Sequence, residues 1–159
     1  MTKKVKRIYV DTSVVGAVID EESRQQQTKP FWDAVHRGEI VIIVSDVLDD
    51  ELTGAPQQVR DFFDGLPESQ IERVVSTQES RDLADKYISE NVVGKSSLTD
   101  CRHIALATIA NADVLVSWNF KHIVNVDRIR GYNSVNEKLS YQRIEIRTPY
   151  PYEVLHDET

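Results

Sequence analysis

Short runs of β-branched and apolar residues alternate along this chain with longer stretches of helical periodicity. The runs lie at roughly 6–10, 39–45, 71–75, 113–117 and 143–147. Residues 39–45 are almost continuously apolar, which is typical of a strand buried on both faces. Residues 143–147 alternate polar and apolar side chains, which predicts a half-exposed edge strand. Because strands that alternate with helices favour a parallel sheet, we predict an α/β fold, a three-layer α/β/α sandwich with a mostly parallel central sheet.

Helical periodicity fills the intervals between these strands. We predict helices at 13–20, 29–37, 47–53, 57–64, about 77–91 and 98–111. The polar run from Glu21 to Thr28 is expected to split the first two, and Asp46 to cap the third. We expect a single domain over 1–147, followed by a loose C-terminal tail over 148–159.

The composition bounds the class of protein. The chain has 159 residues, of which 40% are apolar and 28% charged, as in an ordinary globular domain. No apolar run approaches the ~20 residues that span a bilayer, and the basic N-terminus lacks the apolar segment of a signal peptide. The single cysteine, Cys101, excludes an internal disulfide and favours a reducing compartment. We therefore expect a cytoplasmic protein without a membrane partner.

Charge limits the modes of nucleic-acid binding. The net charge of −7 argues against a protein that coats nucleic acid non-specifically, because neutralising phosphates requires clustered Lys and Arg. Lys121, Arg128 and Arg130 lie in a locally basic stretch and are candidates for individual phosphate contacts. A normally solvated surface explains most of the remaining charges.

The first candidate for chemistry is Asp11, where an apolar strand ends on an acid. In open α/β sheets ligands bind outside the carboxyl ends of the strands, so a carboxylate there is placed for chemistry. The structural alternative is a helix cap or an Asx-turn.

Glu51 is the second candidate, because it falls on the apolar stripe of its predicted helix. It follows Val47 by four residues and Leu48 by three, whereas Asp49 and Asp50 point elsewhere. Such an acid is costly unless it is paired, protonated or bound to a cation. The sequence has no Lys or Arg between positions 39 and 60 to pair it locally.

Asp100 and Asn119 have structural alternatives of similar weight. Ser97 and Asp100 have the spacing of a capping box, in which Asp100 would cap the N-terminus of the helix. Asn119 follows an apolar strand, where an asparagine is usually a turn residue. His103 and His122 lack the ligand spacing of a zinc site, and Cys101 lies on an apolar stripe as a small core residue.

Taken together, these residues favour a divalent-cation site. Carboxylate and amide oxygens are the ligands that Mg²⁺ and Mn²⁺ prefer, and a cation relieves the repulsion between neighbouring acids. Such a cation can polarise a phosphoryl oxygen and generate hydroxide for phosphodiester hydrolysis. The sequence has no nucleophile elbow and no phosphate-cradling glycine loop, so covalent catalysis and nucleotide binding have no support.

Four segments in order resemble the PIN-domain family, specifically the VapC-like ribonuclease toxins of prokaryotic toxin–antitoxin pairs. The resemblance covers about residues 6–147. The matching segments are Ile8-Tyr9-Val10-Asp11-Thr12-Ser13, Leu48-Asp49-Asp50-Glu51-Leu52, Asp100-Cys101-Arg102-His103-Ile104-Ala105-Leu106-Ala107 and Ala112-Asp113-Val114-Leu115-Val116-Ser117-Trp118-Asn119.

The resemblance implies a Rossmann-like PIN fold with a Mg²⁺ (or Mn²⁺) site built from Asp11, Glu51 and Asp100. It also implies endonucleolytic cleavage of RNA, a homodimer and a neutralising antitoxin protein. Asn119 stands where the family commonly has a fourth acid. An amide oxygen can orient water but carries no charge, so a second metal ion would be held weakly.

Two hypotheses follow from the sequence. The preferred one is a metal-dependent endoribonuclease in which Asp11, Glu51 and Asp100 hold the cation. In this hypothesis Asn119 and Ser117 position water or the outer coordination shell of the cation, and Thr12 or Ser13 assists them. The alternative is a catalytically weak PIN-fold module that binds RNA or a protein. A receiver-like phosphoacceptor domain is disfavoured, because the first strand has no acidic pair beside it.

Overall fold

Five parallel strands form the centre of the fold, as the alternating pattern predicts. The computed structural model describes residues 5–155. The strands are β1 (Lys6–Val10), β2 (Ile40–Ser45), β3 (Ile71–Val74), β4 (Val114–Val116) and β5 (Ile146–Arg147). Their order in the sheet is β3-β2-β1-β4-β5, and every neighbouring pair is parallel. The strand predicted at 143–147 does lie at an edge, but only two of its residues pair.

The order of the strands determines where a site can form. From β1 the chain moves outward through β2 and β3 on one side, then crosses to β4 and β5 on the other. The register places Ile8 of β1 between Ile42 of β2 and Val114 of β4. The topological switch point therefore lies between β1 and β4, and ligands bind outside the carboxyl ends of the strands at such a point.

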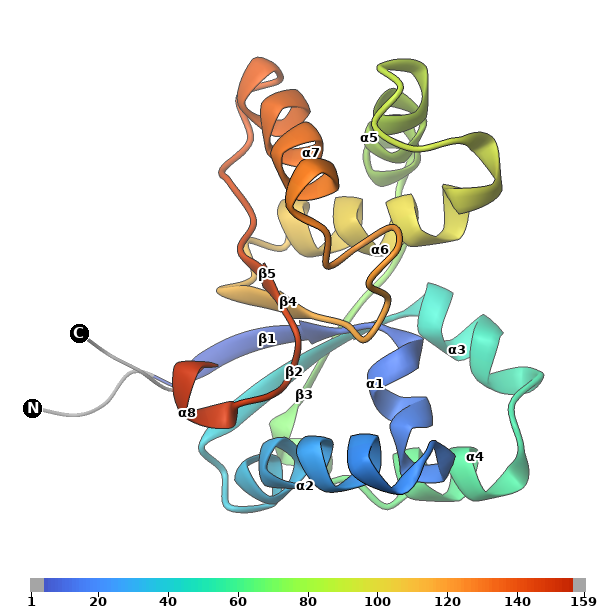
Figure 1. Ribbon diagram of the computed structural model, residues 1–159, viewed down its shortest axis with the longest axis vertical. Helices are drawn as coiled ribbons and strands as arrows, with labels where there is room; N and C mark the ends of the chain where they lie inside the picture. The colour runs from blue at the N-terminus through green and yellow to red at the C-terminus, as the bar shows by residue number, and fades with distance from the viewer. Residues whose placement is uncertain (1–4, 156–159) are drawn as a thin grey trace, which may run out of the picture.

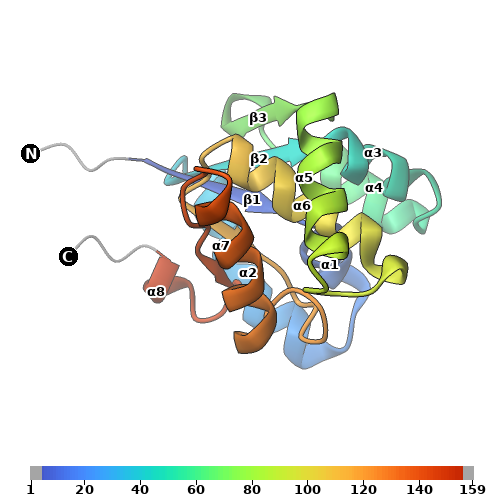
Figure 2. The ribbon, with the colours of Figure 1, turned by 90° about the horizontal axis from the view of Figure 1, so that it is seen from above.

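Helices cover both faces of the sheet, which confirms the three-layer α/β/α prediction (Figure 1). One face carries α1 (Thr12–Gly16), a 3-10 turn (Ala17–Ile19), α2 (Glu22–His36), α4 (Gln57–Asp64) and α8 (Tyr152–Leu155). The other carries α5 (Gln78–Ser89), α6 (Leu98–Ile109) and α7 (Val126–Lys138), which lie over the sheet in Figure 2. The helix α3 (Asp46–Thr53) lies beyond the carboxyl ends of the strands.

Each face of the sheet has its own apolar core. The even-numbered β1 residues Ile8 and Val10 pack towards α1, α2 and α4, whereas Tyr9 packs towards α5, α6 and α7. This division follows from the two-residue period of a strand, which sends successive side chains to opposite faces. The predicted core residue Cys101 is fully buried on the second face.

The predicted break between helices at 21–28 is wrong, because α2 begins at Glu22 and runs through the polar segment. Glutamine, glutamate and arginine are good helix formers, and the exposed Gln26 side chain donates to Glu22 one turn earlier. The helix tolerates Pro30 in its interior. A polar first half is stable here because it lies at the surface and needs no apolar stripe.

Two helix starts also differ from the sequence prediction. Ser45, not Asp46, caps α3 by accepting a hydrogen bond from the Leu48 amide. Asp46 instead accepts from the backbone and hydroxyl of Ser76, which ties α3 to the segment after β3. At α6, Ser97 makes no side-chain capping bond, because a 3-10 turn (Lys95–Ser97) leads directly into the helix. The predicted capping box that would occupy Asp100 does not form.

The helix α7 was not predicted from the sequence. Its core-facing positions include Asn133 and Asn136, which are weak helix formers and break the apolar stripe. Both asparagines are buried and fully used. Asn133 donates to and accepts from the backbone of Ile144, and Asn136 accepts from Tyr87 and donates to Thr108.

Residues 148–155 are packed against the domain instead of forming the loose tail that we expected. Tyr152 and Leu155 of α8 are buried in the core of the α2 face, and the Tyr152 hydroxyl donates to Glu39. Residues 156–159 of that expected tail, and the basic residues 1–4, lie outside the described residues. Within residues 5–155, no helix is both long and apolar enough to cross a membrane.

Candidate active site

Asp11 lies at the switch point, immediately after the central strand β1. Its carboxylate is buried, with 4% of the residue exposed. One oxygen, Oδ1, accepts from Ser13 Oγ at 2.6 Å and from the Val14 amide at 3.3 Å. The other, Oδ2, accepts from Ser117 Oγ at 2.6 Å, across the gap to the end of β4. Asp11 therefore does cap α1, and it also joins the carboxyl ends of two neighbouring strands.

Burial determines the electrostatic state of Asp11. Desolvation raises the pKa of Asp11 above its usual value, and the hydrogen bonds from Ser117 and Ser13 oppose that rise without cancelling it. A buried carboxylate with a raised pKa favours a proton or a cation beside it. This feature is typical of functional sites in clefts, although structural networks produce it too.

Glu51 points from α3 towards the same edge. Its Oε1 accepts from Thr12 Oγ1 at 2.6 Å and from His103 Nε2 at 2.8 Å. Partial burial works against ionisation of Glu51, but these two hydrogen bonds hold its pKa below the usual value. The sequence has no Lys or Arg near Glu51, but in the structure His103 of α6 pairs with it. Its side chain remains 38% exposed, more than a position on the apolar stripe suggested.

His103 belongs to a buried hydrogen-bond chain that the sequence did not indicate. Its side chain is 3% exposed, and its Nδ1 lies 2.7 Å from the Tyr9 hydroxyl. That hydroxyl also lies 2.7 Å from Ser45 Oγ, at the end of β2. Because an ionised Glu51 can only accept, Nε2 of His103 donates to it; in the neutral ring, Nδ1 then accepts from Tyr9. The chain Ser45–Tyr9–His103–Glu51 therefore fixes the orientation of the Glu51 carboxylate.

Asp100 lies in the first turn of α6, one turn before His103, and is partly buried. Desolvation raises its pKa; the charges of Asp11 and Glu51 add to the rise, while His122 and His103 oppose it. The charges of two of the predicted acids, Asp11 and Glu51, thus reach the third, Asp100. Helix capping does not account for Asp100, since the capping box is absent.

Asn119 shapes the loop that follows β4. Its Oδ1 accepts from the amides of Lys121 and His122, and its own amide donates to Ser117 Oγ. The turn role that we weighed for Asn119 is therefore present in the structure. An amide oxygen engaged by two backbone donors has little remaining capacity to coordinate a cation.

The three acids suit a divalent cation chemically, but they are not drawn together into a ligand cluster. Among residues 5–155, no group of three or more His, Cys, Asp or Glu side chains is arranged to hold a metal ion. In favour of the fit are the oxygen-only donors and the repulsion that Asp11 and Glu51 exert on the Asp100 carboxylate, which a cation would relieve. A bound cation would have to compete with the hydrogen bonds that Ser13, Ser117, Thr12 and His103 make to them.

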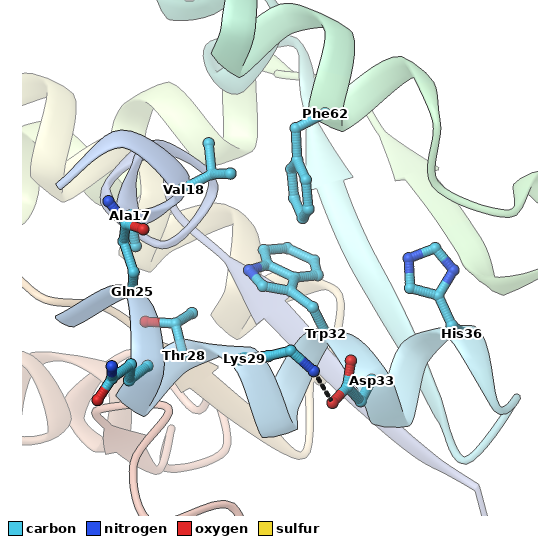
Figure 3. A pocket seen from close by; sticks show the side chains of 10 residues that line it. Ala17, Val18, Gln25, Thr28, Lys29, Trp32, Asp33, His36 and Phe62 are labelled. Carbon is cyan, nitrogen blue, oxygen red and sulfur yellow. Dashed lines mark hydrogen bonds and ion pairs between the residues drawn. The ribbon is translucent and has the colours of Figure 1, made fainter. Parts of the chain in front are cut away.

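A separate apolar pocket lies on the α2 face. It has a volume of about 350 Å³ and is lined by the 3-10 turn after α1, by α2 and by α4. In Figure 3 the rings of Trp32 and Phe62 lie edge to face, with centroids 5.1 Å apart, and Val18 lies beside them; the Lys29–Asp33 ion pair is drawn nearby. Trp32 Nε1 is buried without a hydrogen-bond partner. None of the three candidate acids lines this pocket.

Comparison with known proteins identifies the fold. No protein-family model and no curated protein matches the sequence. Among solved structures, the toxin VapC20 of Mycobacterium tuberculosis, described as cleaving the sarcin–ricin loop, superposes with a TM-score of 0.56 at 15% identity. The match covers 72% of this chain and 91% of VapC20. This chain has a PIN fold.

Two further structures show how far this likeness extends. VapBC2 of Rickettsia felis, solved with a DNA fragment from its promoter, has a TM-score of 0.56 at 13% identity. The match covers 89% of this chain and 98% of that one. Tyrosyl-tRNA synthetase of Aeropyrum pernix has a TM-score of 0.51 at 11% identity, over 91% of this chain and 52% of that one. At such identities the likeness concerns the fold alone, and the chemistry has to be argued from the site.

Proposed function

We propose that this PIN-fold chain is a metal-dependent endoribonuclease that hydrolyses RNA phosphodiester bonds, with Asp11, Glu51 and Asp100 holding Mg²⁺ or Mn²⁺. The observation that carries the proposal is the buried Asp11 at the switch point, whose charge acts on Asp100 together with that of Glu51. Toxins with the same fold support it. By the same likeness we propose an antitoxin protein as a partner; a homodimer and a cytoplasmic location remain predictions.

The chain's own residues have distinct parts in this proposal. A bound Mg²⁺ would supply a Lewis acid for the phosphoryl oxygen and lower the pKa of water. Ser13 and Ser117 hold both oxygens of Asp11, and His103 and Thr12 orient Glu51. Ser117 also accepts from the Asn119 amide, so the end of β4 is rigidly joined to Asp11. Preorganisation of this kind lets the acids act without rearranging during the reaction.

The decisive experiment is cleavage of a structured RNA in Mg²⁺ or Mn²⁺ by wild type, Asp11→Asn, Glu51→Gln and Asp100→Asn. We expect each substitution to lower the cleavage rate by about 100-fold or more, because a lost ligand removes charge from the developing transition state. Chelation by EDTA should abolish cleavage by the wild type. Cleavage is followed by gel electrophoresis of end-labelled RNA.

A matched control lies on the same helix as Glu51. Asp50 is exposed on α3, next to Glu51 in the chain but off the apolar stripe, so Asp50→Asn should cleave like the wild type. Equal rates for wild type and Asp11→Asn would contradict the proposal. So would cleavage that persists unchanged in EDTA.

A second candidate function is a catalytically weak module that binds RNA or a protein. Two observations favour it: Oε1 of Glu51 is already engaged by His103 and Thr12, and the Asn119 oxygen is engaged by backbone amides. Titration calorimetry with Mn²⁺ separates the candidates. Absence of heat at millimolar Mn²⁺, together with retained RNA binding, would favour the binding module.

A further inference from the structure

An exposed aromatic side chain, Phe120, belongs to the loop that follows β4 at the carboxyl edge of the sheet. It is 52% exposed, on the loop between β4 and α7, and follows Asn119 in the chain. An exposed phenyl ring keeps a π-face free for a ligand to stack on. Trp118, two residues earlier, is by contrast 7% exposed and packs into the core of the α2 face.

Phe120 is one layer of a stack that also contains Trp118 and Arg24 of α2. The Trp118 and Phe120 rings meet edge to face, with centroids 6.1 Å apart and planes at 61°. The Arg24 guanidinium lies 4.9 Å from the Trp118 ring centre and 6.0 Å from that of Phe120. Cation–π contacts of this kind hold an arginine against aromatic faces. We call these three side chains the aromatic stack.

Hydrogen bonds hold the stack in position. Trp118 Nε1 donates to Thr28 Oγ1 at 3.0 Å, and Thr28 in turn donates to the Arg24 carbonyl at 2.6 Å. Arg24 also pairs with Asp20 at 3.3 Å. Trp118 and Arg24 are therefore preorganised, and Phe120 packs against both of them.

The same loop connects the stack to Asp11. The Trp118 amide donates to Ser13 Oγ at 2.9 Å, and Ser13 donates to Asp11 at 2.6 Å. On the other side, Asn119 and Ser117 link to the second oxygen of Asp11. The loop that carries Phe120 is thus joined to both carboxylate oxygens of Asp11.

We propose that Phe120, supported by Arg24 and Trp118, is a stacking site for one unpaired base of the RNA that neighbours the cleaved phosphate. The inference rests on the proposed ribonuclease function and narrows its substrate to RNA with an unpaired nucleotide at the cleavage site. Base–aromatic stacking tolerates any base, since every base has a π-face. It also suits a chain of net charge −7, which has few clustered cations to bind phosphates.

The test measures binding without cleavage. Wild type, Phe120→Ala and Phe120→Tyr are titrated in EDTA against a fluorescent RNA hairpin with an unpaired loop and against a fully paired duplex of the same composition. Fluorescence anisotropy gives the dissociation constants. We expect Phe120→Ala to bind the hairpin roughly tenfold or more weakly, and Phe120→Tyr, which keeps an aromatic ring, to bind it like the wild type.

Controls isolate stacking from other contributions. Tyr141→Ala removes a partly buried aromatic side chain just beyond the C-terminal end of α7, whereas Phe120 precedes the N-terminal end of that helix, and it should leave hairpin binding unchanged. Because stacking releases few counterions, Phe120→Ala should weaken binding without changing the slope of log affinity against log salt. Circular dichroism melting verifies that each variant is folded.

Defined outcomes would overturn the inference. One is equal hairpin affinity for wild type and Phe120→Ala; another is an equal loss for hairpin and duplex, which would indicate a general surface contact. A Phe120→Ala variant that binds RNA normally but no longer binds an antitoxin protein would assign the ring to a protein interface instead. Since binding is measured without turnover, a failure of RNA cleavage would leave these results interpretable.

Discussion

The hydroxyl of Tyr9 joins the central strand to the candidate site through two short hydrogen bonds. It lies 2.7 Å from both Ser45 Oγ and His103 Nδ1, in surroundings that raise its pKa by desolvation. A buried hydroxyl with two partners is costly to remove, because the partners are left unsatisfied. Tyr9 is thus both a core residue and a support for the orientation of Glu51.

We predict that Tyr9→Phe lowers the free energy of unfolding by about 1–3 kcal/mol and also slows RNA cleavage. The rate falls because His103 loses the partner that holds its ring against Glu51. Urea unfolding gives the first quantity and the cleavage assay the second.

Tyr87→Phe is the matched control for this substitution. Tyr87 is equally buried, and its hydroxyl donates to Asn136 at 2.6 Å between α5 and α7, with no contact to Asp11, Glu51 or Asp100 among its hydrogen bonds. It should lose a similar amount of stability while keeping the cleavage rate. Cleavage at the same rate by both variants would show that Tyr9 has only a structural part.

The sequence predicts the position of a single functional residue better than it predicts which residue is its hydrogen-bond partner. The place of Asp11 follows from one local feature, an acid at the end of an apolar strand, and the structure puts it at the switch point. The partner of Glu51 could not be found in the same way, because His103 is 52 residues away on another helix. Likewise, the Asn119 side-chain oxygen accepts from two backbone amides because of the turn geometry of its loop, and no residue pattern specifies that geometry.

Among the elements, α7 shows why a helix can escape prediction. Its polar core positions, Asn133 and Asn136, carry hydrogen bonds to other elements, so the apolar stripe is interrupted. Gly131 lies in its middle, where glycine normally destabilises a helix. Here it lets the helix approach Val92, the residue whose Cγ1 would lie 2.7 Å from an added Cβ.

We predict that Gly131→Ala destabilises the protein by about 1–3 kcal/mol, although Gly→Ala usually stabilises a helix. The reason is the clash with Val92, which is buried and β-branched and therefore cannot easily move aside. Thermal or urea unfolding measures the effect.

Ser134→Ala provides the comparison, because Ser134 is exposed on the same helix. It should be neutral or slightly stabilising. A Gly131→Ala variant as stable as Ser134→Ala would mean that the approach to Val92 is not tight. The strands, by contrast, follow directly from β-branched runs that depend on no partner helix.

At the scale of the whole molecule, the two apolar cores are closed by segments far apart in the sequence. The last described helix, α8, lies on the same face as α2 and buries Leu155 to 2% exposure. Nothing in the sequence predicts this docking, since the segment from 148 onwards is short and rich in proline and acids. A four-residue helix has little stability of its own and depends on packing.

We predict that Leu155→Ala lowers the free energy of unfolding by about 2 kcal/mol or more, through loss of buried apolar contacts. The neighbouring Val154 is 42% exposed, so Val154→Ala should change stability by less than about 0.5 kcal/mol. Equal unfolding free energies for the two variants would show that α8 contributes no packing energy.

The contact between Asn133 and Ile144 has a consequence for solubility. The Asn133 side chain donates to the Ile144 carbonyl at 3.0 Å and accepts from its amide at 2.7 Å, as a neighbouring strand would. Beyond Ile144 the edge strand β5 has only two residues; exposed Glu145 precedes it, and its second residue is the exposed Arg147. Free edges invite other chains to add strands and aggregate, and short, charged or covered edges prevent it. Asn133, which interrupts the apolar stripe of α7, thus also protects this edge of the sheet against aggregation.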